Sequence, residues 1–559
     1  MIKAYPHYHK RTVESLNTLW DFRFLEGESM DSVNVASLSF SDKLPVPGAF
    51  DAFPLALGKR GTGVYRREIR LEPGRRGLLE FEAVSFACRI LIDGENVCEH
   101  YCGYSPFNVE VPASDSEVRE LVVLAENRFD FDRIPMHEHF FDFYQFGGLI
   151  RPVWLHHLPE TVLEDVRIDA SDIEGGTVEV RGRAVGASSV KARILDTEVS
   201  PVEAEVDGEG LFSLTMTVDR PELWSPEAPN LYRLHLDCGA DDRIERFGVR
   251  RIETKEGEIL LNGIPVKLLG YNRHEYFPNF GPSTPYPQMV SDIQLLKDCG
   301  CNFVRGSHYP QQQAFLDLCD EFGLLVWEEN LGWGQKEEQY GSPTFRAHHD
   351  QSLREMVARS YNHPSVVIWG FMNEGGSDEE AFASLIDETM SVLRGEGGNR
   401  LSTYASNRIE RDFYFEKVDL ICVNLYPGWY GAQAPEPPLP RIEKDIRTFI
   451  DEMDTRGLQD MPIVISEIGC EALYGWRDEM RDFHSEEYQA DYLETVCRIV
   501  TEMDRIAGVG LWHFSDARTR EHSVGRARGF NNKGTFDEYR RPKLARNVVR
   551  EVFLSSNRQ

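Results

Sequence analysis

The sequence lacks the long apolar runs of a membrane protein. No stretch of the 559 residues approaches the ~20 apolar residues that a membrane-spanning helix needs, and residues 1–10 lack the apolar core of a secretory signal peptide. Cysteine is also sparse, and most of the ten cysteines lie inside apolar strand or helix patterns, as reduced and packed thiols do. We therefore expect a cytoplasmic protein that is not held in a membrane.

Positive charge is in short supply as well. The chain has 61 lysine and arginine residues against 92 aspartate and glutamate residues, so its formal net charge is −31. A field of that sign repels phosphate groups, which disfavours nucleic acids and anionic membrane surfaces as partners. If the substrate is itself an anion, the binding site must supply local positive charge.

Two short segments contain residue types that bind metals. Residues 98–102 (Cys-Glu-His-Tyr-Cys) have a spacing that zinc accepts, but no second pair of ligands follows at zinc-finger spacing, so we interpret them as structural. Residues 136–139 (Met-His-Glu-His) fit a polar loop better than a metal site. We expect neither a metal nor another cofactor.

The chain divides into three parts by its pattern of apolar residues. Residues 1–157 contain many short alternating strands, such as 63–71 and 89–95, which predict a β-sandwich of the jelly-roll kind. Residues 158–252 repeat this pattern at the size of an immunoglobulin-like β-sandwich. Residues 253–559 alternate strands with helices, which predicts a (β/α)8 TIM barrel.

Eight segments of the third part have the composition of buried barrel strands. They are residues 266–271, 302–305, 324–328, 366–372, 401–406, 420–424, 463–466 and 508–514. Helical patterns lie between them, and the one at 312–323 ends in a glycine, as helices often do. Eight alternating units in about 300 residues suffice to close a barrel.

Two of these strands end in a glutamate. The apolar run 366–372 is followed by Asn373 and Glu374, and the run 463–466 by Glu467, so the fourth and seventh strands each place a carboxylate at their carboxyl end. In such barrels this end carries the active site. One glutamate can act as acid and the other as nucleophile. Alternatively, each glutamate caps the helix that follows it.

Longer motifs resemble a known family over nearly the whole chain. Residues 261–275, 302–310 and 362–374 resemble glycoside hydrolase family 2, whose members place a sugar-binding sandwich, an immunoglobulin-like domain and a barrel in this order. Within that family, Ser-Glu-Ile-Gly at 466–469 and Asn-Asn-Lys-Gly at 531–534 are similar to β-glucuronidases. Their Asn-x-Lys-Gly pattern grips the carboxylate of a uronic acid.

The resemblance implies a role for each matching residue. Glu374 would be the general acid/base, Glu467 the nucleophile, and Asn373 would contact the sugar hydroxyl next to the reacting carbon. Asn531 and Lys533 would hold the uronic acid carboxylate. Further residues match positions that contact the sugar or line the pocket: Asp142, His308, Asn424, Tyr426, Tyr430 and Trp512.

The sequence departs from the family pattern at two places. An arginine is expected a few residues before Asn531, but Arg526 and Arg528 flank the expected position, and the motif does not choose between them. The loop after Trp333 is short, which favours an open mouth suited to large conjugates or oligosaccharides.

Several of these residues also have a purely structural interpretation. Lys533 lies in a stretch, residues 518–543, that carries eight lysine and arginine residues and fits a basic surface loop. His308 fits a histidine behind the site, and the aromatic residues fit core positions at the barrel mouth.

The motifs together predict a retaining β-glucuronidase. Such an enzyme hydrolyses β-D-glucuronides to glucuronic acid and an aglycone by double displacement, with two carboxyl groups about 5–5.5 Å apart. The expected substrates are glucuronide conjugates or glycans that contain uronic acid, and a homo-oligomer is compatible with the sequence. The alternatives are a β-galacturonidase or β-galactosidase of the same family, and a non-catalytic carbohydrate-binding protein.

Overall fold

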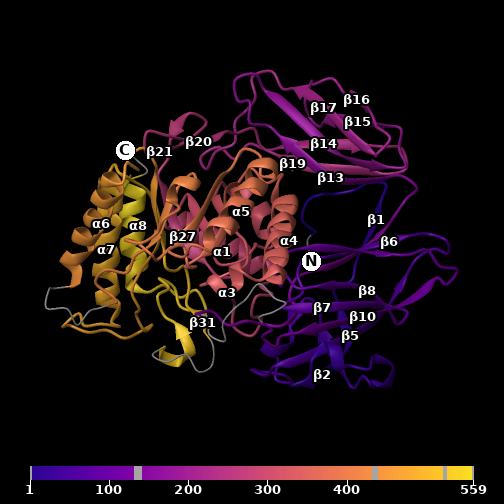
Figure 1. The fold of residues 1–559 in the computed structure, drawn as a ribbon, viewed down its shortest axis with the longest axis horizontal. Coiled ribbons are helices and arrows are strands. Elements are labelled where there is room, and N and C mark those ends of the chain that lie inside the picture. Colours follow the sequence, from indigo (N-terminus) through magenta and orange to yellow (C-terminus); the bar gives the residue numbers. More distant parts are fainter. Residues whose placement is uncertain (1–2, 131–141, 431–437, 520–525, 557–559) are drawn as a thin grey trace.

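The computed structural model describes residues 3–130, 142–430, 438–519 and 526–556. Two β-sandwiches, in indigo and magenta, lie against one side of a barrel that the carboxyl-terminal half of the chain forms (Figure 1). The predicted fold class is confirmed: the two sandwiches come first along the chain and the closed barrel last.

The first sandwich packs a four-stranded antiparallel sheet against a six-stranded one. The four-stranded sheet has the order β1 (Thr12–Ser15), β12 (Val153–His157), β6 (Gly77–Phe81) and β9 (Phe107–Val111). The six-stranded sheet has the order β3 (Asp42–Pro45), β2 (Leu19–Glu26), β5 (Gly61–Arg70), β10 (Val118–Glu126), β7 (Ala87–Ile92) and β8 (Glu95–His100). A short pair, β4 (Gly48–Ala49) and β11 (Gly148–Leu149), lies beside them.

The second sandwich is smaller and consists of seven strands in two antiparallel sheets. One sheet has the order β13 (Val162–Asp169), β14 (Thr177–Val185) and β17 (Leu211–Thr217). The other has the order β16 (Val202–Glu205), β15 (Ser189–Ile194), β18 (Tyr232–Asp237) and β19 (Asp242–Phe247). Strict alternation along β17, with Phe212, Leu214 and Met216 buried, shows why one face becomes the core.

Eight parallel strands close the barrel. They are β23 (Leu268–Arg273), β24 (Phe303–Gly306), β25 (Leu325–Glu329), β26 (Val366–Asn373), β27 (Leu401–Ser406), β28 (Ile421–Asn424), β29 (Ile463–Ile468) and β30 (Ile506–Leu511). All eight predicted strands are confirmed. Every residue of these strands is buried, and strands buried on both faces have the apolar composition from which they were predicted. A small sheet of β20 (Ile252–Lys255), β21 (Glu258–Leu261) and β22 (Ile264–Pro265) precedes them.

Helices surround the barrel. They are α1 (Tyr286–Asp298), α2 (Gln313–Phe322), α3 (Glu337–Tyr340), α4 (Pro343–Ser360), α5 (Phe382–Glu396), α6 (Pro438–Thr455), α7 (Glu486–Glu502) and α8 (Leu544–Ser556). Helix α2 ends at Gly323, whose φ of 71° is a left-handed conformation that glycine adopts without strain, as predicted. Two short strands, β31 (Ala517–Arg518) and β32 (Phe530–Asn531), pair near the barrel mouth.

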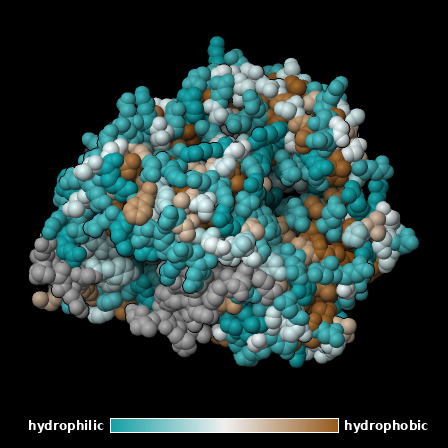
Figure 2. All heavy atoms as spheres, in the orientation of Figure 1, coloured by the Kyte–Doolittle hydropathy of each residue, from teal (hydrophilic) through white to brown (hydrophobic). Residues whose placement is uncertain are grey.

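Among the described residues, no helix is both long enough and apolar enough to span a bilayer. The face in Figure 2 is covered mainly by hydrophilic residues, with apolar ones scattered among them.

All ten cysteines are free thiols. Cys102 is buried and its thiol contacts the carbonyl of His348, whereas the Met-His-Glu-His segment at 136–139 lies outside the described residues.

Buried arginines join the two sandwiches to the barrel. Arg151 of the first sandwich donates from Nη2 to Glu275 Oε2 at 2.8 Å, and both side chains are almost fully buried. Arg250, which follows the second sandwich, donates to the carbonyls of Pro364 and Val366 at 3.0 and 2.9 Å. The second contact fixes the start of β26, the strand whose far end carries Glu374.

Removing Arg151 should destabilise the protein strongly. In Arg151→Leu the Glu275 carboxylate stays buried without its charged partner, which costs about 3–5 kcal/mol for a buried ion pair. We expect a clearly lower urea midpoint. Arg233→Ala is the matched control, because the Arg233–Asp196 pair is exposed and such pairs contribute about 1 kcal/mol or less. Equal shifts in the two variants would contradict a stabilising role for the buried pair.

Candidate active site

A cavity of about 430 Å³ opens at the carboxyl ends of the barrel strands. Nine of the eleven predicted site residues line it, and Phe143, Trp333, Asn407 and Arg526 complete the lining. The nine are Asp142, His308, Glu374, Asn424, Tyr426, Tyr430, Glu467, Trp512 and Lys533. The other two, Asn373 and Asn531, are buried and contact lining residues directly.

Glu374 follows the last residue of β26. Its φ of 50° turns the chain sharply at the end of the strand. Oε1 accepts a hydrogen bond from Asn424 Nδ2 at 2.8 Å, and Oε2 accepts one from the indole of Trp333 at 3.2 Å. Both donors are neutral, so neither of these two hydrogen bonds brings a positive charge to the Glu374 carboxyl group.

Glu467 lies near the end of β29, three strands away from Glu374. Oε1 accepts from Arg305 Nη1 at 3.0 Å, and Oε2 accepts from the Tyr426 hydroxyl at 2.8 Å. Asn424, which donates to Glu374, is the neighbour of Glu467 in the register between β28 and β29. The two carboxyl groups therefore face one cavity, as the sequence predicted.

Burial raises the pKa of both carboxyl groups. The charge of Glu374 raises the pKa of Glu467 further, whereas Arg305 and Tyr426 lower it by contacting its ionised form. Two carboxylates in one buried cavity disfavour each other's ionisation, so the pair retains one proton near neutral pH. Because the positive charge of Arg305 is at Glu467, we place this proton on Glu374.

Arg305 holds the base of the site together, and sequence reasoning missed it. Its guanidinium is fully buried in β24 and donates to Glu329 with two nitrogens, Nε at 2.8 Å and Nη2 at 3.0 Å. Nη2 also donates to Asn373 Oδ1 at 2.9 Å. The signal was present in the sequence: an arginine inside an apolar barrel strand must find a buried carboxylate.

His308 and Trp512 form one wall of the cavity. Their rings stack with centroids 5.2 Å apart. Burial, and then the charge of Arg305, hold the pKa of His308 well below its usual value, so the imidazole is neutral. Its Nδ1 lies 2.8 Å from Glu329 Oε1. This contact assigns the proton to Nδ1 and leaves Nε2 as an acceptor.

Lys533 gives the other end of the cavity a positive charge. Its side chain is buried, and Nζ lies 3.0 Å from the Tyr430 hydroxyl and above the rings of Tyr426 and Tyr430. None of the carboxylates in the described part of the chain forms an ion pair with Nζ. A buried ammonium group of this kind requires an anionic partner.

Arg526, and not Arg528, lines the cavity. Its guanidinium forms two hydrogen bonds with the carboxylate of Asp142, one of them from Nε at 3.0 Å. Asp142 belongs to the chain between β10 and β11, so the first sandwich contributes to the site, and Asn531 Nδ2 donates to it at 2.9 Å. Arg528 is half-exposed and pairs with Glu538 instead.

The loop after Trp333 is the one from which the sequence predicts an open mouth of the site. Between Trp333 and α4 it contains only the single turn α3. The preference for large aglycones that we inferred from this loop stays a prediction.

The cavity places carboxylates beside positively charged side chains. Three groups of described histidine, cysteine and acidic side chains converge closely enough to hold an ion, and all three lie elsewhere. In the cavity, the charges of Arg305, Arg526 and Lys533 lie beside the carboxylates instead.

Comparison with known proteins agrees with this geometry. Residues 252–557 match the family described as "Glycosyl hydrolases family 2, TIM barrel domain", and residues 161–250 match "Glycosyl hydrolases family 2". A β-glucuronidase of Streptococcus agalactiae is 27% identical, over 98% of this chain and 96% of that protein.

Two solved structures have the same arrangement over almost their whole length. A family 2 β-galacturonidase from Eisenbergiella tayi, bound to galacturonate, is 33% identical with a TM-score of 0.90, over 99% of each chain. A Bifidobacterium dentium β-glucuronidase in complex with coumarin-3-O-glucuronide is 25% identical with a TM-score of 0.89, over 98% of this chain and 97% of that one. The chain therefore belongs to glycoside hydrolase family 2 and is a glycoside hydrolase.

Proposed function

We propose that this enzyme is a retaining β-glucuronidase that works by double displacement. Glu467 attacks the anomeric carbon while Glu374 gives its proton to the leaving glycosidic oxygen, so the aglycone departs as an alcohol. A water molecule then attacks the glycosyl ester as Glu374 takes its proton. This second step releases glucuronic acid and restores both carboxyl groups.

The charge of Glu467 controls the proton on Glu374. While Glu467 is ionised, its field and the burial of the site keep Glu374 protonated. Once Glu467 is esterified that charge is gone, and the pKa of Glu374 falls. Glu374 can then act as a base in the second step.

Lys533 carries the assignment to uronides. Its buried ammonium has no carboxylate partner among the described residues, and Arg526 and Asn531 lie at the same end of the cavity. The carboxylate at carbon 6 of a uronic acid supplies the missing negative charge. The neutral hydroxymethyl group of a galactoside leaves Lys533 uncompensated, which disfavours a β-galactosidase.

The amide of Asn373 supports a sugar in this orientation. Its Oδ1 accepts from Arg305 and Asn424, so the side chain is fixed, while its buried Nδ2 lacks a partner among the described residues. A hydroxyl group of the substrate next to the reacting carbon would accept from Nδ2. Such a contact would strengthen as charge develops on the sugar.

A β-galacturonidase is the second candidate. The 33% identical solved structure bears that name, and the two sugars differ only in the configuration at carbon 4. Release of 4-nitrophenol from the β-glucuronide, the β-galacturonide and the β-galactoside separates the candidates. We expect the highest kcat/KM for the glucuronide. Faster turnover of the galacturonide would replace our assignment, and no turnover of any glycoside would support a non-catalytic carbohydrate-binding protein.

Replacing the two glutamates should give different signatures. Glu374→Ala should lose about 10²- to 10⁴-fold in kcat/KM for a poor leaving group and much less for 4-nitrophenol, which needs no protonation, while kcat for 4-nitrophenol is limited by the second step, which lacks its base. Azide should restore its turnover and yield a β-glycosyl azide, because the small anion attacks the glycosyl ester. Glu467→Gly should be inactive without azide, and with azide it should yield the α-glycosyl azide, because the anion replaces the missing nucleophile. The same product anomer from both variants would refute the assigned roles.

Lys533→Met should shift selectivity toward neutral sugars. The variant loses a charge-assisted hydrogen bond, so kcat/KM for the β-glucuronide should fall about 10- to 100-fold, with little loss for the neutral β-glucoside. Arg528→Ala is the matched control: the residue is basic, nearby and paired with Glu538, so its loss should leave the ratio unchanged. Equal losses on both substrates in Lys533→Met would argue against carboxylate recognition.

Arg305 should set the acid limb of the pH profile. Its charge lowers the pKa of Glu467, so removing it raises that pKa and moves the acid limb of kcat/KM to higher pH. The double variant Arg305→Gln/Glu329→Gln avoids leaving a buried carboxylate unpaired. Glu329→Gln alone is the control and should keep the limb in place. An unmoved limb in the double variant would mean that Arg305 acts only on structure.

Cellular location and assembly stay predictions from the sequence. The free cysteines are compatible with the reducing conditions of the cytoplasm. A homo-oligomer, and the absence of nucleic-acid and membrane partners, likewise await solution measurements.

A further inference from the structure

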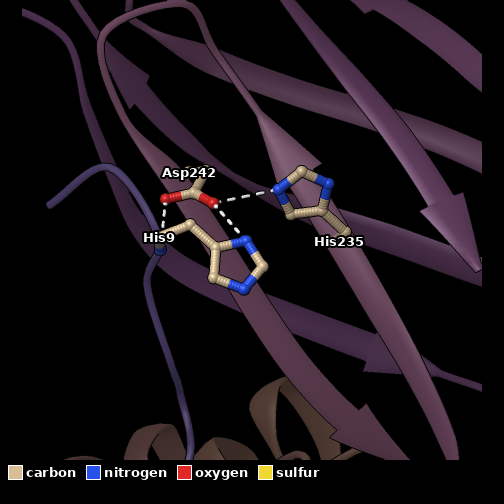
Figure 3. A group of neighbouring side chains, drawn as sticks. All are labelled: His9, His235 and Asp242. Atoms are coloured by element: carbon tan, nitrogen blue, oxygen red, sulfur yellow. Dashed lines mark hydrogen bonds and ion pairs between the residues drawn. The ribbon is translucent and has the colours of Figure 1, made fainter. Parts of the chain in front are cut away.

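Two histidines and an aspartate converge far from the catalytic cavity, where the amino-terminal segment meets the second sandwich. His9 precedes β1, His235 lies in β18, and Asp242 begins β19 (Figure 3). Asp242 Oδ2 lies 3.0 Å from His235 Nε2 and 3.5 Å from His9 Nδ1. Both imidazoles thus point one nitrogen at the same carboxylate oxygen.

The backbone fixes these three residues before any ligand arrives. Asp242 Oδ1 accepts from the backbone amides of His9 and Lys10 at 2.8 and 2.7 Å, which leaves Oδ2 for the imidazoles. Residue His7 forms a bridge of two backbone hydrogen bonds with Ile244, the partner of His235 in the register between β18 and β19. Preorganisation of this kind lowers the cost of closing a binding site.

The spacing of the three donor atoms suits a tetrahedral ion. With zinc–nitrogen and zinc–oxygen bonds of about 2.0–2.1 Å, the edge of a tetrahedron is about 3.3–3.4 Å. The two distances from Asp242 Oδ2 lie on either side of this value. All three donor atoms lie within 4.8 Å of one another, so small side-chain rotations complete the third edge.

The charges around the cluster suit a cation as well. The ammonium of Lys10 does not compete, because it pairs with Asp237. His9 is largely exposed, which gives an ion from solution access to the cluster and leaves room for a water ligand.

We propose that His9, His235 and Asp242 form a binding site for a divalent transition-metal ion, with zinc as the best fit. The ion takes three protein ligands and water, and it ties the amino-terminal segment to the second sandwich. The two imidazole donors favour zinc, because calcium and magnesium take oxygen ligands. The site is independent of the proposed glycosidase activity.

Calorimetric titration of the EDTA-treated, full-length protein with zinc chloride tests the proposal. We expect one zinc per chain at the tightest site, and a Kd raised at least about ten-fold in His9→Ala and in His235→Ala. His9 is exposed, so His9→Ala should fold normally. His7→Ala is the matched control, since His7 lies in the same segment outside the cluster, and it should bind zinc like the parent.

A stability measurement gives a second, independent readout. Zinc should raise the thermal midpoint of the parent and of His7→Ala, because it binds only the assembled site. It should not raise the thermal midpoint of His9→Ala or His235→Ala. Cobalt should give the visible absorption of a tetrahedral complex in the parent but not in His9→Ala or His235→Ala. Absence of tight zinc binding, or unchanged binding in His9→Ala and His235→Ala, would overturn the proposal.

Discussion

The buried guanidinium of Arg305 is the interaction on which the active site depends. It binds Glu329 through two nitrogens, contacts Asn373 and touches Glu467, so it positions three polar side chains that the barrel could not otherwise bury. Each of these groups is costly to bury alone. Together they form a rigid floor whose single positive charge favours the ionised form of Glu467. Burial, and then the same charge, hold the pKa of His308 below its usual value, so Arg305 influences two titratable groups of the site.

The barrel alone does not complete this site. Asp142 reaches the cavity from the first sandwich and holds Arg526, while Arg250 fixes the start of the strand that ends at Glu374. The first sandwich therefore contributes a side chain to the cavity, whereas Arg250 holds the amino end of β26. Their burial against the barrel relies on arginines such as Arg151, whose partners would be unpaired charges if the parts separated.

Sequence reasoning found the strands and both glutamates because burial and chemistry leave local patterns. A strand buried on both faces must be apolar, so Glu374 and Glu467 stand out where each run stops. The choice between Arg526 and Arg528 has no such pattern, since a left-handed turn at Arg528, with φ 63°, sends the two side chains apart. The cluster of His9 and Asp242 was not predicted from the sequence for another reason. These two residues lie 233 residues apart and meet only through tertiary structure.

Selectivity for an anionic sugar depends on the one cavity cation that lacks a carboxylate partner among the described residues, Lys533. The charge of Arg526 is already matched by Asp142 and Glu471, and that of Arg305 by Glu329 and Glu467. Among the described residues, the ammonium group of Lys533 contacts the hydroxyl of Tyr430 and two aromatic rings and has no carboxylate partner. A uronic acid carboxylate compensates this charge, whereas a neutral sugar covers it and leaves it unpaired, which costs binding free energy. Discrimination then comes from the penalty on the wrong substrate as much as from contacts with the right one.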